Sequence, residues 1–182
     1  MIRIGITGGI ASGKTFICKA LEAAGKAVFY CDAEAKRIIR QDPQVKQSLQ
    51  MLVGKDVYDT QGRLVKAVLA SFICRGKEFS TQVDRIVHPK VALAWQQFCK
   101  SLPTQTPIVF MECALLFEAG FEHLVDLSVL IHVSKQTQLQ RLMARDGISR
   151  EKALEWMQLQ LPEKEKLLRA DLVWENEKHA HY

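Results

Sequence analysis

The residues best suited to chemistry lie near the N-terminus, in a glycine-rich segment that ends in Gly13, Lys14 and Thr15. The segment fits the pattern G-x-x-x-x-G-K-[ST], in which glycines let the backbone turn so that successive N–H groups face an anion. We expect Lys14 to reach the β- and γ-phosphates of a nucleoside triphosphate, and the Thr15 hydroxyl to bind Mg²⁺. The residues predicted to bind the nucleotide here are Gly8, Gly9, Ile10, Ala11, Ser12, Gly13, Lys14, Thr15 and Phe16.

The elements on either side of this segment are those that a phosphate-binding loop requires. Ile2, Ile4 and Ile6 form an apolar run that predicts a buried strand before it. Behind it, apolar residues recur at helical spacing from Phe16 until Gly25 ends the helix. An ordinary glycine-rich turn is the alternative. Because strand, loop, lysine, threonine and helix come in the required order, the sequence predicts a site for a nucleoside triphosphate.

Two carboxylates near the ends of predicted strands are candidates for a role in phosphoryl transfer. Asp32 closes the predicted strand Val28–Cys31, which in most such sheets is adjacent to the phosphate loop. Its carboxylate can accept the proton of an attacking hydroxyl or orient a magnesium ligand, or it can cap the helix that starts at Ala33. Glu112 follows the third predicted strand, where it can contact Mg²⁺ through water or be a solvated charge.

Two arginines in the helical region of residues 135–169 are candidates for binding the transferred group. Arg141 and Arg145 are one helical turn apart and therefore lie on one face. Two guanidinium groups on one side can clamp phosphoryl oxygens and neutralise charge in the transition state, so both are predicted to be catalytic and Arg141 also to bind the nucleotide. The alternative is that they pair with Asp146 or Glu151 at the surface.

Five apolar runs separated by helical patterns predict an α/β fold with a doubly wound, parallel, five-stranded sheet. The runs are Ile2–Ile6, Val28–Cys31, Ile108–Met111, Leu127–Val133 and Asp171–Trp174. We predict a single domain. Its core comprises residues 1–32 and 104–182, its helical substrate-binding insertion residues 33–103, and its helical lid approximately residues 142–165.

The insertion is expected over the carboxyl ends of the strands, where ligands bind in such sheets, and so to recognise a second substrate. The alternative is that its helices only pack on the sheet, as crossover helices do. His88 lies within it and precedes Pro89. The histidine can contact a substrate phosphate or cap a helix that begins at the proline.

Length and charge limit the classes of protein. A chain of 182 residues suits one well-cored α/β domain, and no apolar stretch approaches the roughly 20 residues that cross a bilayer. No secretory signal is visible. The net charge of +5 suits a polyanionic small substrate, whereas the scattered basic residues do not indicate nucleic-acid binding. Five cysteines without C-x-x-C spacing are interpreted as reduced thiols of a cytoplasmic protein.

In the order and spacing of its motifs, the sequence resembles the dephospho-coenzyme A kinases over almost its whole length. The run Ile4–Thr15 is similar to the family's strand and phosphate loop, and Asp32 stands where the family has its catalytic base. The other matching residues are Gly62, Lys66, Val87–Pro89, Leu115–Glu118, Gln138–Arg141, Arg145, Asp146, Gln160, Ala170, Asp171 and Asn176. The sequence departs from the family's usual glycine, aspartate, proline and glycine at Ala11, Tyr30, Ala114 and Glu177. It ends at Tyr182, earlier than is usual.

The resemblance implies a kinase that uses ATP and Mg²⁺ to phosphorylate the ribose 3′-hydroxyl of dephospho-coenzyme A. The substrate contacts that it implies come from Asp32, Lys66, His88, Leu115 and Glu118. A nucleoside monophosphate kinase or a shikimate kinase would share the loop and the arginines. A GTPase-type switch would need an Asn-Lys-x-Asp motif, which the sequence lacks. A nucleotide-binding protein that has lost catalysis is a further alternative, and the sequence identifies no protein partner.

Overall fold

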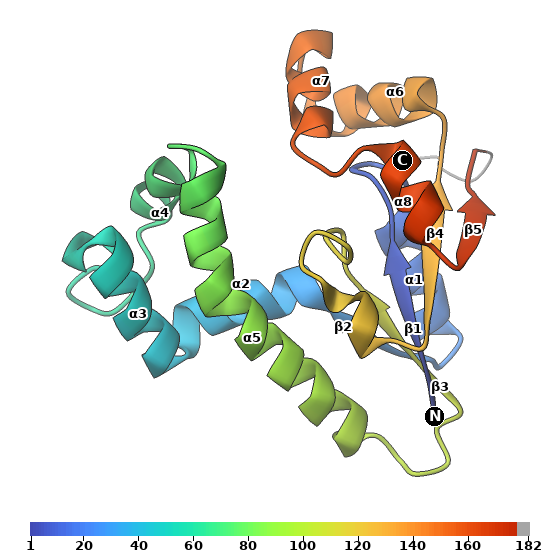
Figure 1. The fold of residues 1–182 in the computed structure, drawn as a ribbon, viewed down its shortest axis with the longest axis horizontal. Coiled ribbons are helices and arrows are strands. Elements are labelled where there is room, and N and C mark those ends of the chain that lie inside the picture. The colour runs from blue at the N-terminus through green and yellow to red at the C-terminus, as the bar shows by residue number, and fades with distance from the viewer. Residues whose placement is uncertain (178–182) are drawn as a thin grey trace. The chain divides into compact units, whose positions relative to one another are not determined.

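The structure, a computed structural model, describes residues 1–177 and divides into two compact units (Figure 1). The first unit comprises Met1–Tyr30 and the chain from Ser101 onward, and the second comprises Cys31–Lys100. The first unit contains β1 (Ile2–Thr7), α1 (Lys14–Ala23), β2 (Ala27–Tyr30), β3 (Ile108–Glu112), β4 (Leu127–His132), α6 (Lys135–Asp146), α7 (Arg150–Gln158), α8 (Glu163–Arg169) and β5 (Leu172–Glu175). The second contains α2 (Cys31–Gln41), α3 (Pro43–Val53), α4 (Lys66–Ile73) and α5 (Lys77–Ser101).

All five strands of the first unit are parallel and lie in the order β2-β3-β1-β4-β5, so the predicted fold class is confirmed. In the middle of the sheet, Ile6 of β1 is opposite Glu112 of β3 on one side and Val129 of β4 on the other. Strands are therefore added on both sides of β1. The loop that follows β1 lies where ligands bind in doubly wound sheets.

The expectation that the second strand lies beside the phosphate-loop strand is wrong, because β3 lies between them. The apolar content of the strands gives the reason. Val109 and Met111, which point to the same face of β3, are fully buried, as suits an inner strand of the sheet. The four-residue strand β2 instead forms one edge of the sheet.

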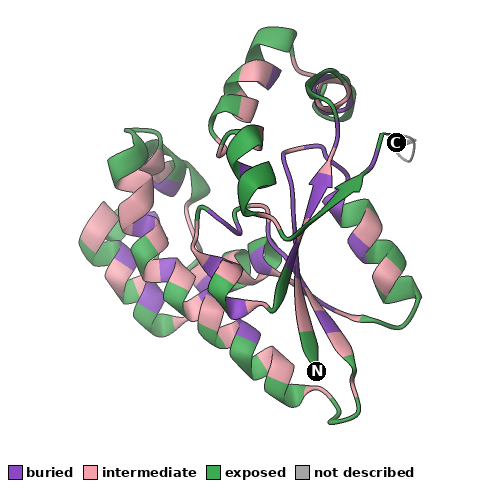
Figure 2. Ribbon diagram, turned by 45° about the vertical axis from the view of Figure 1, so that its right-hand side comes forward, coloured by how far each residue is buried: buried purple, intermediate pink, exposed green. Residues whose placement is uncertain are grey.

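The core of the first unit joins α1 to the sheet. Cys18 of α1 is completely buried against Ile6, Val28 and Ile131, which come from three different strands. Every residue of the opposite edge strand β5 is exposed. Figure 2 shows the difference between the buried residues of the inner strands and the exposed β5. The best-packed part of the sheet is therefore the part that holds the loop after β1.

The second unit is helical, and its longest helix, α5, passes through Pro89 (Figure 1). The alternative that Pro89 begins a helix is therefore wrong. Val83, Val87, Val91 and Trp95 recur every four residues and are buried, so one continuous apolar stripe holds α5 together across the proline. Within residues 1–177, no helix is both long and apolar enough to span a membrane.

An ion pair joins the beginnings of two central strands. Asp126, just before β4, accepts hydrogen bonds from the backbone N–H of Arg3 at 2.8 Å and from the Arg3 side chain at 2.5 and 3.1 Å. The Asp126 N–H donates to the Arg3 carbonyl at 2.8 Å. These hydrogen bonds, from the side chain first, lower the pKa of Asp126 to about 2.

We expect Asp126→Asn to lower the free energy of unfolding at pH 7 by about 1 kcal/mol, since both side chains are partly exposed and solvent weakens the pair. Because the pKa of this carboxyl is depressed in the folded state, its contribution is present above the ordinary pKa near 4 and is lost as the pH falls toward 2. Urea denaturation of both proteins between pH 7 and pH 2.5 measures this. A difference that stays constant over that range would contradict the assignment.

Candidate functional site

The loop after β1 presents a helix N-terminus that no side chain of residues 1–177 caps. Helix α1 begins at Lys14 behind Gly13, without a side-chain hydrogen bond to its first turn and without an acidic residue in that turn. The first N–H groups of a helix have no acceptor within the helix, and the helix dipole makes this end positive. The arrangement therefore suits an anion.

Lys14 is the buried cation of this loop. Its ammonium donates to the carbonyl oxygens of Gly8 at 2.8 Å and Gly9 at 3.0 Å. The pKa of Lys14 is lowered to about 8, chiefly by burial; the carboxylate of Glu112 acts to raise it and the positive charge of Lys166 acts to lower it. A buried ammonium near a second lysine is electrostatically unfavourable, so a bound phosphate would stabilise it.

Two glycines of the loop leave room for side chains that hold the loop in place. A Cβ atom at Gly9 would collide with the side-chain amide of Gln138, and one at Gly13 with that of Asn176. Gly13 also has a φ angle of 95°, which side chains rarely adopt. The Asn176 amide donates to the Ser12 carbonyl at 2.9 Å. These glycines therefore allow the chain after β5 and helix α6 to approach the loop closely.

Ala11 adopts a left-handed conformation, with a φ angle of 60°, at a position where the resemblance leads one to expect glycine. This conformation costs an alanine about 1 kcal/mol. The alanine is buried with Leu139 and Leu142 of α6 and Ala153 of α7. Burial of the methyl group returns a similar amount, about 0.8 kcal/mol. At Ala11, packing between the loop and the helices thus offsets the strain of the left-handed backbone.

Two glutamines from the region after β4 form hydrogen bonds with the same loop. Gln138 of α6 donates to the Ile10 carbonyl at 2.6 Å, and Gln160, between α7 and α8, accepts from the Ile10 N–H at 2.7 Å. Both hydrogen-bonding groups of one loop residue are therefore occupied by side chains from distant parts of the sequence. The loop and the region after β4 form one continuous hydrogen-bonded site.

The two candidate arginines have different surroundings. Arg141 is buried and donates from Nη2 to the carbonyl oxygens of Asn176 at 2.8 Å and Glu177 at 3.1 Å. Within residues 1–177, its buried Nη1 atom has no hydrogen-bond partner. Arg145 instead makes two hydrogen bonds with Asp146, at 2.8 and 2.9 Å. For Arg145, the structure thus contains the surface pairing that the sequence left open.

The other predicted site residues of the first unit lie in α1, at the end of β3 and in the segment that follows β3. Thr15 and Phe16 are exposed in the first turn of α1. Glu112 is the last residue of β3 and is buried, so the alternative of a solvated charge is wrong. Leu115 is partly exposed, and Glu118 accepts the N–H of Leu161 at 2.9 Å.

Three candidates belong to the second unit. Asp32 lies in the first turn of α2, which begins at Cys31, and its exposed carboxylate pairs with Lys36 at 2.5 Å. It is therefore inside the helix and does not cap a helix starting at Ala33, because β2 ends at Tyr30 and the helix follows at once. Lys66 is the exposed first residue of α4. His88 lies in α5, 3.5 Å from Asp84.

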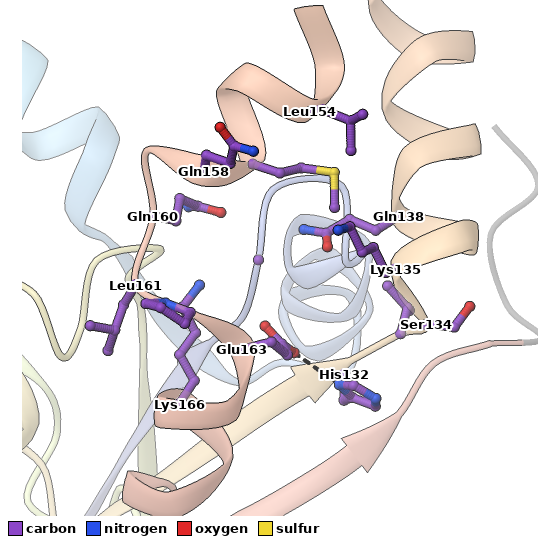
Figure 3. Close-up of a pocket in the computed structure, with 14 residues that line it drawn as sticks. His132, Ser134, Lys135, Gln138, Leu154, Gln158, Gln160, Leu161, Glu163 and Lys166 are labelled. Atoms are coloured by element: carbon purple, nitrogen blue, oxygen red, sulfur yellow. Dashed lines mark hydrogen bonds and ion pairs between the residues drawn. The ribbon is translucent and has the colours of Figure 1, made fainter. Parts of the chain in front are cut away.

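A cavity of about 560 Å³ opens between the loop, the end of β4 and helices α6 to α8 (Figure 3). Its lining includes Gly9, His132, Gln138, Gln160, Glu163 and Lys166. His132 Nδ1 lies 2.8 Å from Glu163 Oε1, which ties β4 to α8. Lys166 was not among the residues predicted from the sequence. The segment Glu163–Arg169 has charges throughout, so its pattern does not distinguish the one buried lysine.

The sheet, the phosphate loop and the helices that hold it define a phosphate-loop kinase. The family model described as dephospho-CoA kinase matches residues 2–181. A dephospho-CoA kinase of Bacteroides fragilis is 35% identical over 172 residues, which are 94% of this chain and 83% of the relative. One from Syntrophotalea carbinolica is 36% identical over 177 residues, 97% and 84% of the two chains.

Solved structures share the fold. A protein of Thermus thermophilus has a TM-score of 0.83 and 34% identity, covering 98% of this chain and 90% of its own. A dephospho-CoA kinase from Campylobacter jejuni shares the fold, with a TM-score of 0.71 and 24% identity, covering 97% and 88%. The chain belongs to the dephospho-CoA kinase family. The match favours this family over the other small-metabolite kinases considered from the sequence.

We expect the two arginines to contribute unequally to stability. Arg141→Met removes two hydrogen bonds from a buried cation and should lower the free energy of unfolding by about 2 kcal/mol. Arg145→Met removes a partly exposed ion pair and should change it by less than about 0.5 kcal/mol. The two variants are matched controls, one turn apart on α6, and urea denaturation compares them. Equal losses would contradict the difference in their surroundings.

Proposed function

We propose that this chain transfers the γ-phosphate of ATP to the ribose 3′-hydroxyl of dephospho-coenzyme A, producing coenzyme A and ADP. The observation that carries the proposal is the buried Lys14 beside the uncapped N-terminus of α1, in a chain that belongs to the dephospho-CoA kinase family. A triphosphate would bind with its phosphates on the N–H groups from Gly8 to Phe16 and on the Lys14 ammonium.

The residues of the loop suit Mg²⁺ bound together with phosphates. Thr15 offers a hydroxyl oxygen, and Glu112 offers a carboxylate at the end of the strand next to β1. Among residues 1–177, no cluster of three or more acidic, histidine or cysteine side chains can hold a metal alone. Mg²⁺ is usually held by one or two protein oxygens together with substrate phosphates, so the residues fit the ion. When bound, it would neutralise the charge that develops on the phosphates.

We assign the other roles by position in the chain and by chemistry. Asp32 accepts the proton of the attacking hydroxyl, and Arg145 binds the transferred phosphoryl group after releasing Asp146. Arg141 lines the nucleotide site through its unsatisfied Nη1 atom. Residues 33–103 form the substrate-binding insertion and approximately residues 142–165 the lid. Contacts to dephospho-coenzyme A come from Asp32, Lys66, His88, Leu115 and Glu118.

The setting that we propose is the cytoplasm. The five cysteines, which all lie within residues 1–177, form no disulfide bond, as is usual in a reducing compartment. Both substrates are small molecules, and the activity requires neither a nucleic acid nor a membrane.

The purified protein should release ADP and form coenzyme A when ATP and dephospho-coenzyme A are supplied together. Lys14→Met is the control, and we expect it to lower turnover at least about 100-fold, since it removes a cation that acts on the phosphates. Its melting temperature should stay the same or rise, because the change removes a buried charge. An ADP-release assay, mass spectrometry of the product and a thermal melt provide the measurements. If the wild-type protein instead phosphorylated shikimate or a nucleoside monophosphate, the assignment of dephospho-coenzyme A as the substrate would be wrong.

For the base, we expect Asp32→Asn to lower turnover by roughly 10²- to 10⁴-fold while the Kd for ATP changes little. The matched control is Glu34→Gln in the same helical turn, since Glu34 also pairs with a cation of the next turn, Arg37. Steady-state kinetics and ATP titration of both variants separate the roles. If Asp32→Asn weakens ATP binding and leaves the turnover of the saturated enzyme normal, the carboxylate is a metal or helix anchor.

A further inference from the structure

Lys166 is a buried cation, and no counter-ion among residues 1–177 is in contact with it. Its side chain is only 1% exposed, although it belongs to the short charged helix α8. Within the part of the chain that the structure describes, its ammonium has no hydrogen-bond or ion-pair partner. The two nearby carboxylates are engaged elsewhere, Glu163 with His132 and Glu118 with the Leu161 N–H. Lysines are almost never buried in this way unless something pairs with them.

Lys166 and the phosphate loop line the same cavity. Lys166 lines the same cavity as Gly9, whose carbonyl accepts from Lys14. Figure 3 shows Lys166 and Glu163 extending from α8 into this cavity, below Gln160. Gln160 ties the segment before α8 to Ile10. The position of Lys166 is therefore coupled to the loop by a hydrogen bond.

The charges of the two lysines are close enough to act on each other. The Lys166 charge lowers the pKa of Lys14, and burial lowers the pKa of Lys166 itself. Glu118 and Glu163 offset this only in part, since they raise the pKa of Lys166 less than burial lowers it. Two buried ammonium groups whose charges act on each other are unfavourable until a multiply charged anion binds next to them.

We propose that Lys166 contacts the terminal phosphate of the bound nucleoside triphosphate, as a second ammonium beside Lys14. This inference rests on the proposed function, because the terminal phosphate is the group to be transferred. Lys166 then distinguishes ATP from ADP, and it neutralises charge on the side of the phosphate that faces α8. The cation is already largely desolvated before ATP binds, so little desolvation opposes the contact.

Titration calorimetry with ATP and ADP, in the absence of dephospho-coenzyme A, tests the inference. We expect Lys166→Met to weaken ATP binding by about 10- to 100-fold and ADP binding by much less, since a charged hydrogen bond to the third phosphate is lost. Lys164→Met is the matched control, because Lys164 is exposed on the same helix. It should leave both affinities unchanged. Lys166→Arg, which keeps the charge, should retain most of the preference for ATP.

The ratio of the two affinities is measured on one sample, so a partly unfolded variant still gives an answer. If Lys166→Met does not fold at all, Lys166→Gln, which keeps a polar group of similar length, replaces it. An unchanged ratio in a folded variant overturns the inference. So does a loss of dephospho-coenzyme A binding with the ratio unchanged, which would assign the lysine to the acceptor. A failure of the proposed function shows separately, as wild-type protein that binds ATP and does not phosphorylate dephospho-coenzyme A.

Discussion

The main constraint on the first unit is that it must accommodate a positive charge buried at the start of α1. Within residues 1–177, the Lys14 ammonium donates only to the carbonyl oxygens of Gly8 and Gly9, which compensate its charge weakly compared with a carboxylate or a phosphate. The loop must therefore keep its shape without its anion. It does so because Ile10 and Ser12 are bonded to side chains from α6, from the segment after α7 and from the chain after β5.

These bonds make the helices after β4 part of the phosphate site. Ala11 packs its methyl group into the cluster of α6 and α7, so the loop has both polar and apolar contacts with the same helices. Arg141 extends the connection to the chain after β5. Any opening of the region from α6 to α8 must break the two glutamine bonds to Ile10 or move the loop with it. A movement of these helices would therefore be coupled to the loop.

The charges of the site are arranged around positions for anions. Lys166 lines the cavity, and its charge acts on the buried Lys14, as does the carboxylate of Glu112. Within residues 1–177, the buried Nη1 atom of Arg141 has no acceptor. Such an arrangement is unfavourable for the folded protein alone and favourable with a polyanion bound. The buried charges thus lower the stability of the protein alone and prepare the site for an anion, since charged groups that are already in place need little reorganisation on binding.

The sequence alone determined the phosphate loop, the five strands and the parallel α/β fold, because these depend on local patterns: a motif of fixed spacing, apolar runs and glycines at the turns. It misplaced β2, since strand order depends on pairing between segments that are far apart in the sequence. It could not separate Arg141 from Arg145, which share a helix face and differ only in what the folded chain puts beside them. The burial of Lys166 could not be predicted for the same reason. Only the tertiary structure decides which of several similar charged residues is buried away from solvent.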